Sequence, residues 1–197
     1  MKAIDPIDKE EFFTQVGYDN PDDYNERFNN RIAEIEDAEI KAILKENIPE
    51  DIVVTDIGCG TGLGRTLIDN EYIGVDQTIE AIEYCKEHHE GTFINKSVEE
   101  YIKTVDSLNP ITLFSLDYIE LDTVEEMIQK TDKVFIAIHY DKPYKSNTSV
   151  YSKDKKTYYE LHPKKVIKER MNLFKKYNAE TYNLLGQDYY YVTIIKK

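Results

Sequence analysis

The chain has 197 residues, of which 41% are hydrophobic, and a formal net charge of −13 at pH 7. This length suits one globular domain, and the negative charge argues against nucleic acid as the default partner. No run of about 18 apolar residues could span a membrane, the first residues lack a secretory-signal pattern, and the two cysteines form neither a disulfide framework nor a metal-ligand spacing, so we expect a cytoplasmic protein.

The charge is unevenly distributed along the chain. Residues 141–197 contain 13 Lys and Arg against 6 Asp and Glu, a net of +7, whereas residues 1–140 contain 12 against 32, a net of −20. The basic part is also rich in tyrosine, and a basic, aromatic surface can hold an acidic or nucleic-acid substrate. An ordinary solvated surface has the same composition, so both interpretations stay open.

Strand and helix patterns alternate through the middle of the chain. Apolar residues at steps of three and four first predict a helix over residues 23–46. Strands are then predicted at Ile52–Ile57, Tyr72–Val75, Thr92–Asn95, Ile111–Leu116 and Val134–Ile138, with helices at Ile79–His89, from Ser97 to about Ser107 and from Asp122 to about Lys130. The last two helices each open with a Ser or Asp followed three residues later by Glu, which is a capping pattern. Such alternation predicts an α/β fold with a doubly wound, mostly parallel sheet and helices on both faces.

The carboxyl-terminal part follows a different pattern. Pro163 suits the first turn of a helix that runs to about Tyr177. Two strands, Glu180–Leu185 and Tyr189–Ile195, follow it and are separated by only three residues. Strands so close in sequence pair antiparallel, so the sheet is predicted to end in an antiparallel hairpin.

Four of the eight glycines fall within the seven residues 58–64, directly after the first predicted strand. Glycine lets the backbone turn tightly and approach a ligand, and open α/β sheets bind ligands at the carboxyl ends of their strands. The helix start near Gly62 also presents free N–H groups to an anion. A phosphate loop is excluded because no Gly-Lys-Ser/Thr follows. The dinucleotide pattern is excluded because Leu63 and Arg65 stand where its third glycine is needed.

Two acids accompany the glycines. Asp56 precedes the first glycine, where a carboxylate would repel a pyrophosphate but suit an ammonium group. Asp76 ends the second strand, where a carboxylate can accept hydrogen bonds from both hydroxyls of a ribose. Together the acids and glycines predict a ligand with a ribose, a carboxylate and a cationic group.

These residues resemble a known family. The segments "VVTDIGCGTG" and "YIGVDQT" look like the first two motifs of the class I S-adenosylmethionine-dependent methyltransferases, and the resemblance covers the chain from about Tyr24 to Lys197. It implies a Rossmann-like, seven-stranded sheet with the terminal hairpin, and S-adenosylmethionine as cofactor. The single domain would comprise an N-terminal helical cap (1–50), a cofactor-binding half (51–139), a substrate-facing loop (140–162) and a helix with the hairpin (163–197).

The resemblance implies roles for residues of both motifs. Asp56 would contact the methionine amino group, usually through water. The backbone of Gly58, Cys59 and Gly60 would pass beside the methionine and the ribose. Asp76 would contact the ribose, and Gln77 would border the adenine.

Two later segments match the family's third and fourth motifs. In "NKSVEEY", Ser97 stands where the family often has an acid on the adenine amino group, and the Val98 backbone N–H would reach the ring. Ser97 is also the predicted helix cap, so its hydroxyl has a competing local role. In "FSLDYIEL", Ser115 would lie near the methionine and the transferred methyl.

The acceptor side gives fewer indications. "SLDY", Ser115 to Tyr118, resembles the Ser/Asp/Asn-Pro-Pro-Tyr of nucleic-acid amino-methyltransferases, but it lacks both prolines and also suits an ordinary strand exit. His139, predicted to follow the fifth strand, is a candidate general base or a hydrogen-bonded loop histidine. No catalytic residue is assigned, because the sulfonium is already a strong electrophile and the enzyme must chiefly position the reactants.

The sequence therefore predicts methyl transfer from S-adenosylmethionine to a small-molecule acceptor. Two alternatives stay open: a methyltransferase that acts on nucleic acid or protein through residues 141–197, and a binding module that holds the cofactor without turnover. The acceptor and the oligomeric state are not predicted.

Overall fold

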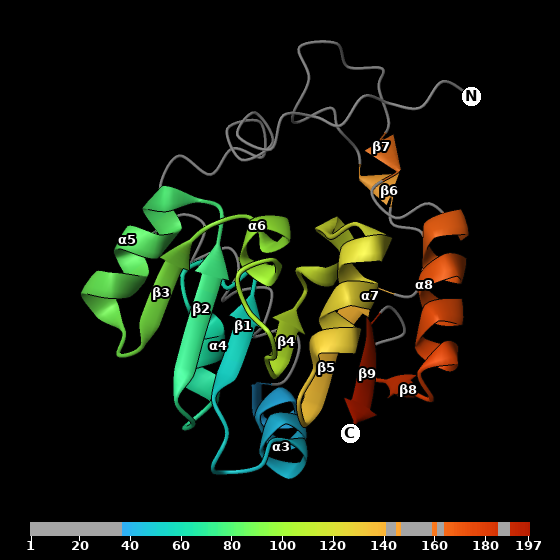
Figure 1. Cartoon of the computed structure of the whole chain (residues 1–197), viewed down its shortest axis with the longest axis horizontal. Coiled ribbons are helices and arrows are strands. Elements are labelled where there is room, and N and C mark those ends of the chain that lie inside the picture. The colour runs from blue at the N-terminus through green and yellow to red at the C-terminus, as the bar shows by residue number, and fades with distance from the viewer. Residues whose placement is uncertain (1–36, 141–144, 147–158, 161–163, 185–189) are drawn as a thin grey trace.

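A seven-stranded sheet forms the centre of the computed structural model, which describes residues 37–140, 145–146, 159–160, 164–184 and 190–197 (Figure 1). The strand order is β3-β2-β1-β4-β5-β9-β8. The strands are β1 (Val54–Ile57), β2 (Tyr72–Asp76), β3 (Thr92–Asn95), β4 (Pro110–Leu113), β5 (Val134–Tyr140), β8 (Glu180–Asn183) and β9 (Tyr190–Lys196). The helices are α3 (Asp37–Asn47), α4 (Leu63–Leu67), α5 (Ile79–His88), α6 (Val98–Ile102), α7 (Leu121–Lys130) and α8 (Lys164–Lys176).

The pairing of the strands confirms the predicted fold class. β1 pairs parallel with β2 and β4, while β3 and β5 extend the parallel sheet on either side. β9 runs antiparallel between β5 and β8, as predicted for a terminal hairpin. The carboxyl ends of β1 to β5 therefore share one edge of the sheet, which we call the carboxyl edge; it is the upper edge in Figure 1.

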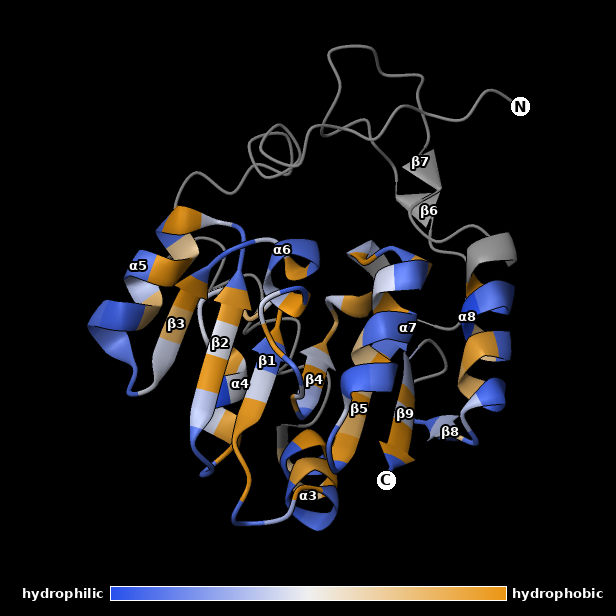
Figure 2. Ribbon diagram, viewed as in Figure 1, coloured by the Kyte–Doolittle hydropathy of each residue, from blue (hydrophilic) through white to orange (hydrophobic). Residues whose placement is uncertain are grey.

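Helices cover both faces of the sheet, and each face has its own apolar cluster. In Figure 2 the strands carry much of the apolar colouring, and the helices turn hydrophilic residues outward. One cluster joins the sheet to α3, α4 and α5, and the other joins it to α6, α7 and α8. Among the buried helix residues are Ile40, Leu67 and Ile82 on the first face and Ile102, Met127 and Phe174 on the second.

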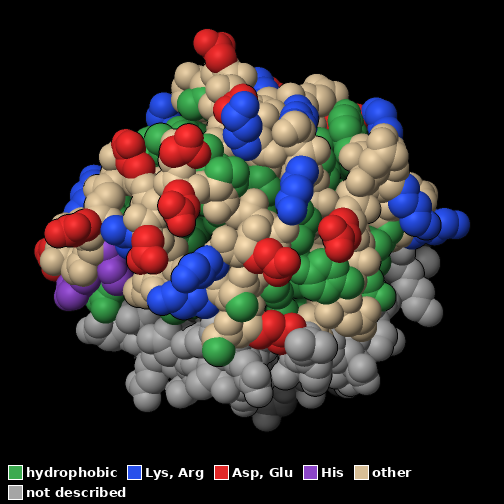
Figure 3. Space-filling view, turned by 90° about the horizontal axis from the view of Figure 1, so that it is seen from below, with side chains coloured by type: hydrophobic (Ala, Val, Ile, Leu, Met, Phe, Trp, Pro, Cys, Tyr) green, Lys and Arg blue, Asp and Glu red, His purple; other side chains and the backbone are tan. Residues whose placement is uncertain are grey.

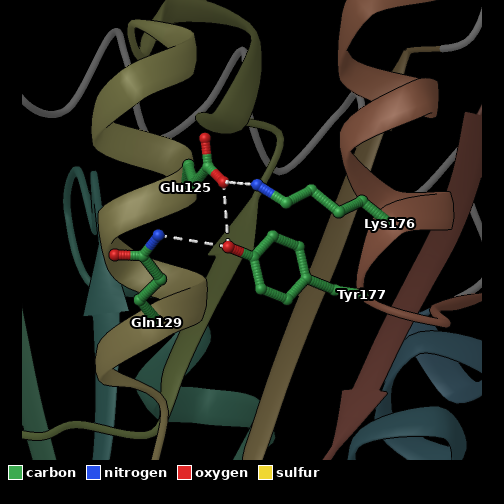
Figure 4. Close-up of polar contacts among 4 residues, drawn as sticks. All are labelled: Glu125, Gln129, Lys176 and Tyr177. Carbon is green, nitrogen blue, oxygen red and sulfur yellow. Dashed lines mark hydrogen bonds and ion pairs between the residues drawn. The ribbon is translucent and has the colours of Figure 1, made fainter.

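A polar network ties α7 to the end of α8 on the molecular surface (Figure 4). The Glu125 carboxylate accepts hydrogen bonds from the Lys176 ammonium and, at 2.9 Å, from the Tyr177 hydroxyl. Gln129 Nε2 donates to the same hydroxyl at 3.1 Å. The lysine lowers the pKa of Glu125 most strongly, and the tyrosine adds to that effect. This network holds α8 beside α7 outside the apolar cluster that the two helices share.

Strand β4 ends earlier than the sequence predicted. The expected strand Ile111–Leu116 is wrong at its end, because β4 stops at Leu113 and Phe114 has a positive φ of 64°. Leu116–Tyr118 then forms a 3-10 turn, so "SLDY" is not simply a strand exit. Phe114 and Leu116 are both buried, and their apolar character concealed the turn.

Other boundaries also differ from the predictions. The helix expected from Ser97 to about Ser107 ends at Ile102, although Ser97 and Glu100 do form the predicted capping box. The predicted cap at Asp122 is wrong, because α7 begins at Leu121 and Asp122 lies in its first turn. The helix predicted over 23–46 is described only from residue 37, as α3. Its predicted first part, residues 23–36, lies outside the described ranges.

Residues 140–162, predicted as a substrate-facing loop, contain two short strands, β6 (Lys145–Ser146) and β7 (Tyr159–Glu160), which pair antiparallel. The rest of that segment lies outside the described residues. None of the helices in the described ranges has the length and apolarity that a bilayer crossing requires.

The surface opposite the carboxyl edge has no single-sign character. Figure 3, seen from below, shows acidic and basic side chains interspersed there with hydrophobic ones between them. A groove in this region is lined by Glu46, Asn47, Glu180, Tyr182, Ile194 and Lys196. Burial, followed by Glu180 and Glu46, raises the pKa of Tyr182.

Candidate functional site

The loop between β1 and α4 uses glycine for its conformation. Gly58, Gly60 and Gly62 have φ values of 71°, 51° and 82°, in the left-handed region that other residues enter only with strain. The N–H groups of Gly58 and Cys59 both donate to the Val75 carbonyl, at 2.8 and 3.1 Å. The loop is therefore bound to the end of β2, and the predicted glycine-rich turn is present at the carboxyl edge.

Asp76 connects this loop to the following turn. Its Oδ2 accepts a hydrogen bond from Gly60 N at 2.9 Å, and its Oδ1 accepts one from Thr78 N at 2.8 Å. Asn95 Nδ2 donates to the carbonyls of Asp76 and Gln77, at 3.2 and 2.8 Å. An ionised carboxylate offers about four lone-pair sites. Among contacts with the described residues, two sites remain open on this half-buried side chain, which the backbone already orients.

Asp56 lies inside the protein, beneath the first turn of α4. Its side chain is only 1% exposed, and its Oδ2 accepts a 2.5 Å hydrogen bond from the Tyr72 hydroxyl. A Cβ on Gly64 would stand 2.1 Å from the same Oδ2, so the helix can approach the carboxyl only because residue 64 is glycine. Burial raises the pKa of Asp56 to about 7, Tyr72 opposes that rise, and Asp76 adds to it.

The other carboxyl oxygen of Asp56 has no hydrogen-bond partner. Oδ1 is buried, and within the described part of the chain no donor reaches it. An ionised carboxylate with an unpaired buried oxygen is unfavourable, which agrees with the raised pKa. A cationic or hydrogen-bonding ligand group that reached Oδ1 would remove this penalty.

The end of β4 closes against the glycine loop. A Cβ on Gly58 would stand 2.5 Å from the Ser115 Cβ. The Ser115 hydroxyl donates to the carbonyl of Ile57, which fastens β4 to the end of β1. Phe114, in its left-handed conformation, directly precedes this contact. Strained backbone of this kind clusters at functional sites, and here it aims Ser115 at the loop.

Helix α5 and its C-cap His89 support the loop, although the sequence predicted His88 and His89 to be a surface pair. Cys59 Sγ and Cys85 Sγ both lie near the Gly60 carbonyl, at 3.6 and 3.3 Å. His89 Nε2 is 3.0 Å from the Thr61 carbonyl. The hydrogen bond with Cys85 and burial raise the pKa of the Cys59 thiol, which favours its neutral form. Cys85 lies in α5 and His89 is its C-cap, so their spacing by four, which brings two residues to one side of a helix, was the available signal.

The predicted adenine side lies beside Asp76. β2 and β3 pair Asp76 with Asn95, and Lys96 N donates to the Asp76 carbonyl at 3.0 Å, so Ser97 follows at the same edge. The Ser97 hydroxyl accepts from Glu100 N at 3.2 Å and thus caps α6. Gln77 is exposed and Val98 is half-buried.

His139 was predicted to follow the fifth strand, and this prediction is wrong. It lies within β5, is 1% exposed, and places Nε2 2.8 Å from the Thr193 hydroxyl of β9. Its ring also lies 5.4 Å from that of Phe174. The strand extends further than expected because β9 pairs with it as far as Tyr140.

The carboxyl edge is thus the candidate site. It brings together Asp56, the glycine loop, Asp76 and Ser115, with Ser97 next to them. The groove at Glu46 and Tyr182 lies at the opposite edge, since Lys196, which lines it, pairs with the first residue of β5. In the described ranges no group of three His, Cys, Asp or Glu residues could hold a metal ion.

Comparisons with known proteins agree with this geometry at the level of the fold. Neither a protein-family model nor a curated protein matches the chain. Among solved structures, it is similar to the plantazolicin methyltransferase BpumL in complex with SAH, at 12% identity and a TM-score of 0.56, covering 98% of this chain and 91% of that chain. It is also similar to an rRNA methylase from Streptococcus thermophilus, at 13% identity and a TM-score of 0.55, covering 80% and 93%.

A third similar structure is magnesium protoporphyrin IX methyltransferase (ChlM) from Synechocystis PCC 6803 with bound SAM, at 12% identity and a TM-score of 0.54, covering 83% of this chain and 78% of that chain. At these identities the likeness establishes the fold. The chain has the class I S-adenosylmethionine-dependent methyltransferase fold.

The contact between Gly58 and Ser115 generates a prediction about stability. Gly58→Ala should lower the free energy of unfolding by about 1–2 kcal/mol through the left-handed backbone and by a further ~1–3 kcal/mol through overlap with Ser115. Adding Ser115→Gly should recover the overlap part, and urea unfolding of the two single variants and the double variant measures this coupling. Strict additivity of the two substitutions would show that the loop and the end of β4 are not in contact.

Proposed function

We propose that this chain is a methyltransferase that binds S-adenosylmethionine at the carboxyl edge and transfers its methyl group to a small-molecule acceptor. The observation that carries the proposal is the Asp76 carboxylate, fixed by Gly60 N and Thr78 N beside a loop of left-handed glycines. This constellation lies at the ends of β1 and β2, next to the point where the strand order reverses between β1 and β4. Open α/β sheets bind their ligands at such a point.

The residues of the carboxyl edge fit this cofactor group by group. The free lone pairs of Asp76 would accept from the ribose hydroxyls, and the backbone of Gly58, Cys59 and Gly60 would pass beside the methionine and ribose. Adenine would be bordered by Gln77 and the Val98 backbone. Because Ser97 Oγ caps α6, its contact with adenine would use the lone pair that the cap leaves free.

The methionine end would meet Asp56 and Ser115. The unpaired Asp56 Oδ1 suits a cationic amino group, directly or through one water. Ser115 is held by its hydrogen bond to Ile57 and would face the methionine and the transferred methyl.

The bound cofactor supplies a methyl group on a sulfonium, which is already a strong electrophile. The chain's contribution is to hold that group in line with the acceptor and to exclude competing water. A general base is required only if the acceptor must lose a proton first. No residue of the chain is assigned this role.

The acceptor is proposed to be a small molecule because the chain carries a net charge of −13, which opposes a polyanion. The fold itself does not decide the acceptor. Similar structures are named for rRNA, magnesium protoporphyrin IX and plantazolicin. Nucleic acid is the second candidate, favoured only by the +7 charge of residues 141–197.

Asp76 provides the test of cofactor binding. Asp76→Asn should weaken binding of S-adenosylhomocysteine by roughly 10- to 150-fold, since one charge-assisted hydrogen bond is worth about 1.5–3 kcal/mol. Isothermal calorimetry measures the affinity, and circular dichroism checks that the fold persists. The matched control is Asp69→Asn, an exposed acid between α4 and β2, which should bind as the wild type does. Equal affinity of the two variants would remove Asp76 from the site.

The acceptor class is tested by salt dependence. A protein that contacts phosphates releases counterions, so log affinity falls with log salt by about 0.7–0.9 per neutralised phosphate. We expect tRNA and duplex DNA to bind no more tightly than the non-specific range of about 10⁻⁴–10⁻⁶ M at physiological salt. Fluorescence titrations across salt concentrations measure this. Submicromolar binding that weakens steeply with salt would replace the small-molecule acceptor by nucleic acid.

A further inference from the structure

We propose that Tyr72 is a positioning residue of the cofactor site: it holds the Asp56 carboxyl beneath the glycine loop, and this carboxyl releases a proton when the cofactor binds. The inference rests on the proposed function, because it requires the ligand to bring a cationic group to the carboxyl edge. It assigns a role to a residue of the "YIGVDQT" segment to which the resemblance gives none, and it makes cofactor affinity depend on pH.

The geometry of the pair supports a positioning role. Tyr72 and Asp56 lie on the neighbouring strands β2 and β1, on one face of the sheet, because β1 and β2 align Val54 with Tyr72 and Asp56 with Gly74. Both side chains are buried, and their oxygens are 2.5 Å apart. Tyrosine is the donor in this bond if the carboxyl is ionised, and such charge-assisted bonds are short and strong.

The contacts around Oδ2 leave the carboxyl little freedom. Tyr72 binds Oδ2 from the strand side, and the backbone of Gly64 closes over it from α4. Oδ1 is the oxygen that remains buried without a partner in the described ranges. Tyr72 therefore determines which oxygen is left without a hydrogen bond from the described residues.

The charges around Asp56 favour a proton in the absence of ligand. From β2, Tyr72 donates to the carboxyl and Asp76 repels its ionised form. From the loop, the Cys59 thiol lies close enough for Asp56 to raise its pKa. From α4, Arg65 lies 5.9 Å from the centre of the Tyr72 ring, but its Nε is bound to the Glu90 carbonyl. Among the described lysines and arginines, none forms an ion pair with Asp56.

These surroundings determine the sign of the coupling. Burial and Asp76 raise the pKa of Asp56 to about 7, so near neutral pH a substantial fraction of the free protein has this carboxyl protonated. A ligand ammonium favours the ionised form and lowers that pKa. Binding then releases up to one proton, and affinity rises with pH until the free protein is fully ionised. From about pH 6 to about pH 8 the expected gain is about tenfold.

Removing the tyrosine hydroxyl should shift this dependence rather than only weaken binding. The Tyr72 hydrogen bond lowers the pKa of Asp56. Without it, the midpoint of the affinity curve should move to higher pH, and affinity should approach that of the wild type above the new midpoint. A purely structural tyrosine would lower affinity by the same factor at every pH.

The experiment is isothermal calorimetry of S-adenosylhomocysteine binding to the full chain from about pH 6 to about pH 9, in buffers of different ionisation heat. Four proteins are compared: the wild type, Tyr72→Phe, Asp56→Asn and Tyr101→Phe. Tyr101 is a buried tyrosine of α6 on the opposite face of the sheet, so its variant is the matched control. The ligand's own amino group titrates alike in all four proteins. Its contribution is therefore removed by subtracting the pH dependence measured with Asp56→Asn.

The wild type and Tyr101→Phe should release a proton and gain affinity with pH, Tyr72→Phe should show a raised midpoint, and Asp56→Asn should show neither effect. Wild-type binding without proton release would overturn the inference while leaving the proposed function intact. Failure of the wild type to bind at any pH would instead contradict the proposed function. If Tyr72→Phe does not fold, the difference in proton release between the wild type and Asp56→Asn still decides whether Asp56 is the source of the proton. An unchanged midpoint in a folded Tyr72→Phe would make Tyr72 ordinary packing.

Discussion

The backbone after β1 can turn through three left-handed glycines because the end of β2 holds its N–H groups. Val75 accepts from Gly58 and Cys59, and the Asp76 side chain accepts from Gly60. These bonds join the adjacent parallel strands β1 and β2 at the point where each strand leaves the sheet. The position of α4, the conformation of the carboxyl edge and the orientation of the acids all depend on them, since a loop released here would free each of those elements.

Close approach is the second consequence of this arrangement. Gly58 meets Ser115, and Gly64 meets the Asp56 carboxyl, at distances that a Cβ would forbid. The glycines therefore serve two purposes: some supply a left-handed backbone, and Gly64 supplies space. This accounts for the concentration of half the glycines in seven residues. It also explains how a carboxyl at the end of a buried strand can be covered so completely that it becomes a weak acid.

The arrangement of strands was predictable because apolar periodicity reports which residues face a core. Alternation of strands and helices, the parallel order and the terminal hairpin all follow from it. The end of β4 was not predictable, because Phe114 and Leu116 stay buried although the backbone turns between them. Periodicity also failed at His139, where pairing with β9, a strand distant in sequence, extends β5.

The candidate site was predictable only where the chain folds on itself locally. The positions of the glycines and Asp76 could be predicted from their spacing in the sequence, and that of Ser97 from its capping-box pattern. The burial of Asp56 depends on Tyr72, Gly64 and the desolvation of the whole face, which no spacing encodes. Support of the loop by Cys85 and His89 likewise arises from packing, because the residues that they contact, Gly60 and Thr61, lie 25 and 28 positions away in the sequence. A pattern in the sequence names the residue types, whereas packing decides their protonation and their partners.

We propose the carboxyl edge, with its glycine loop, as the cofactor site. Backbone amide shifts from ¹H–¹⁵N spectra, recorded as S-adenosylhomocysteine is added, test this most directly. We expect saturable shifts at Gly58, Gly60 and Thr78, with Glu180 and Lys196 at the opposite edge unaffected. Shifts confined to the groove around Glu46 and Tyr182, or no shifts at saturating ligand, would contradict the claim.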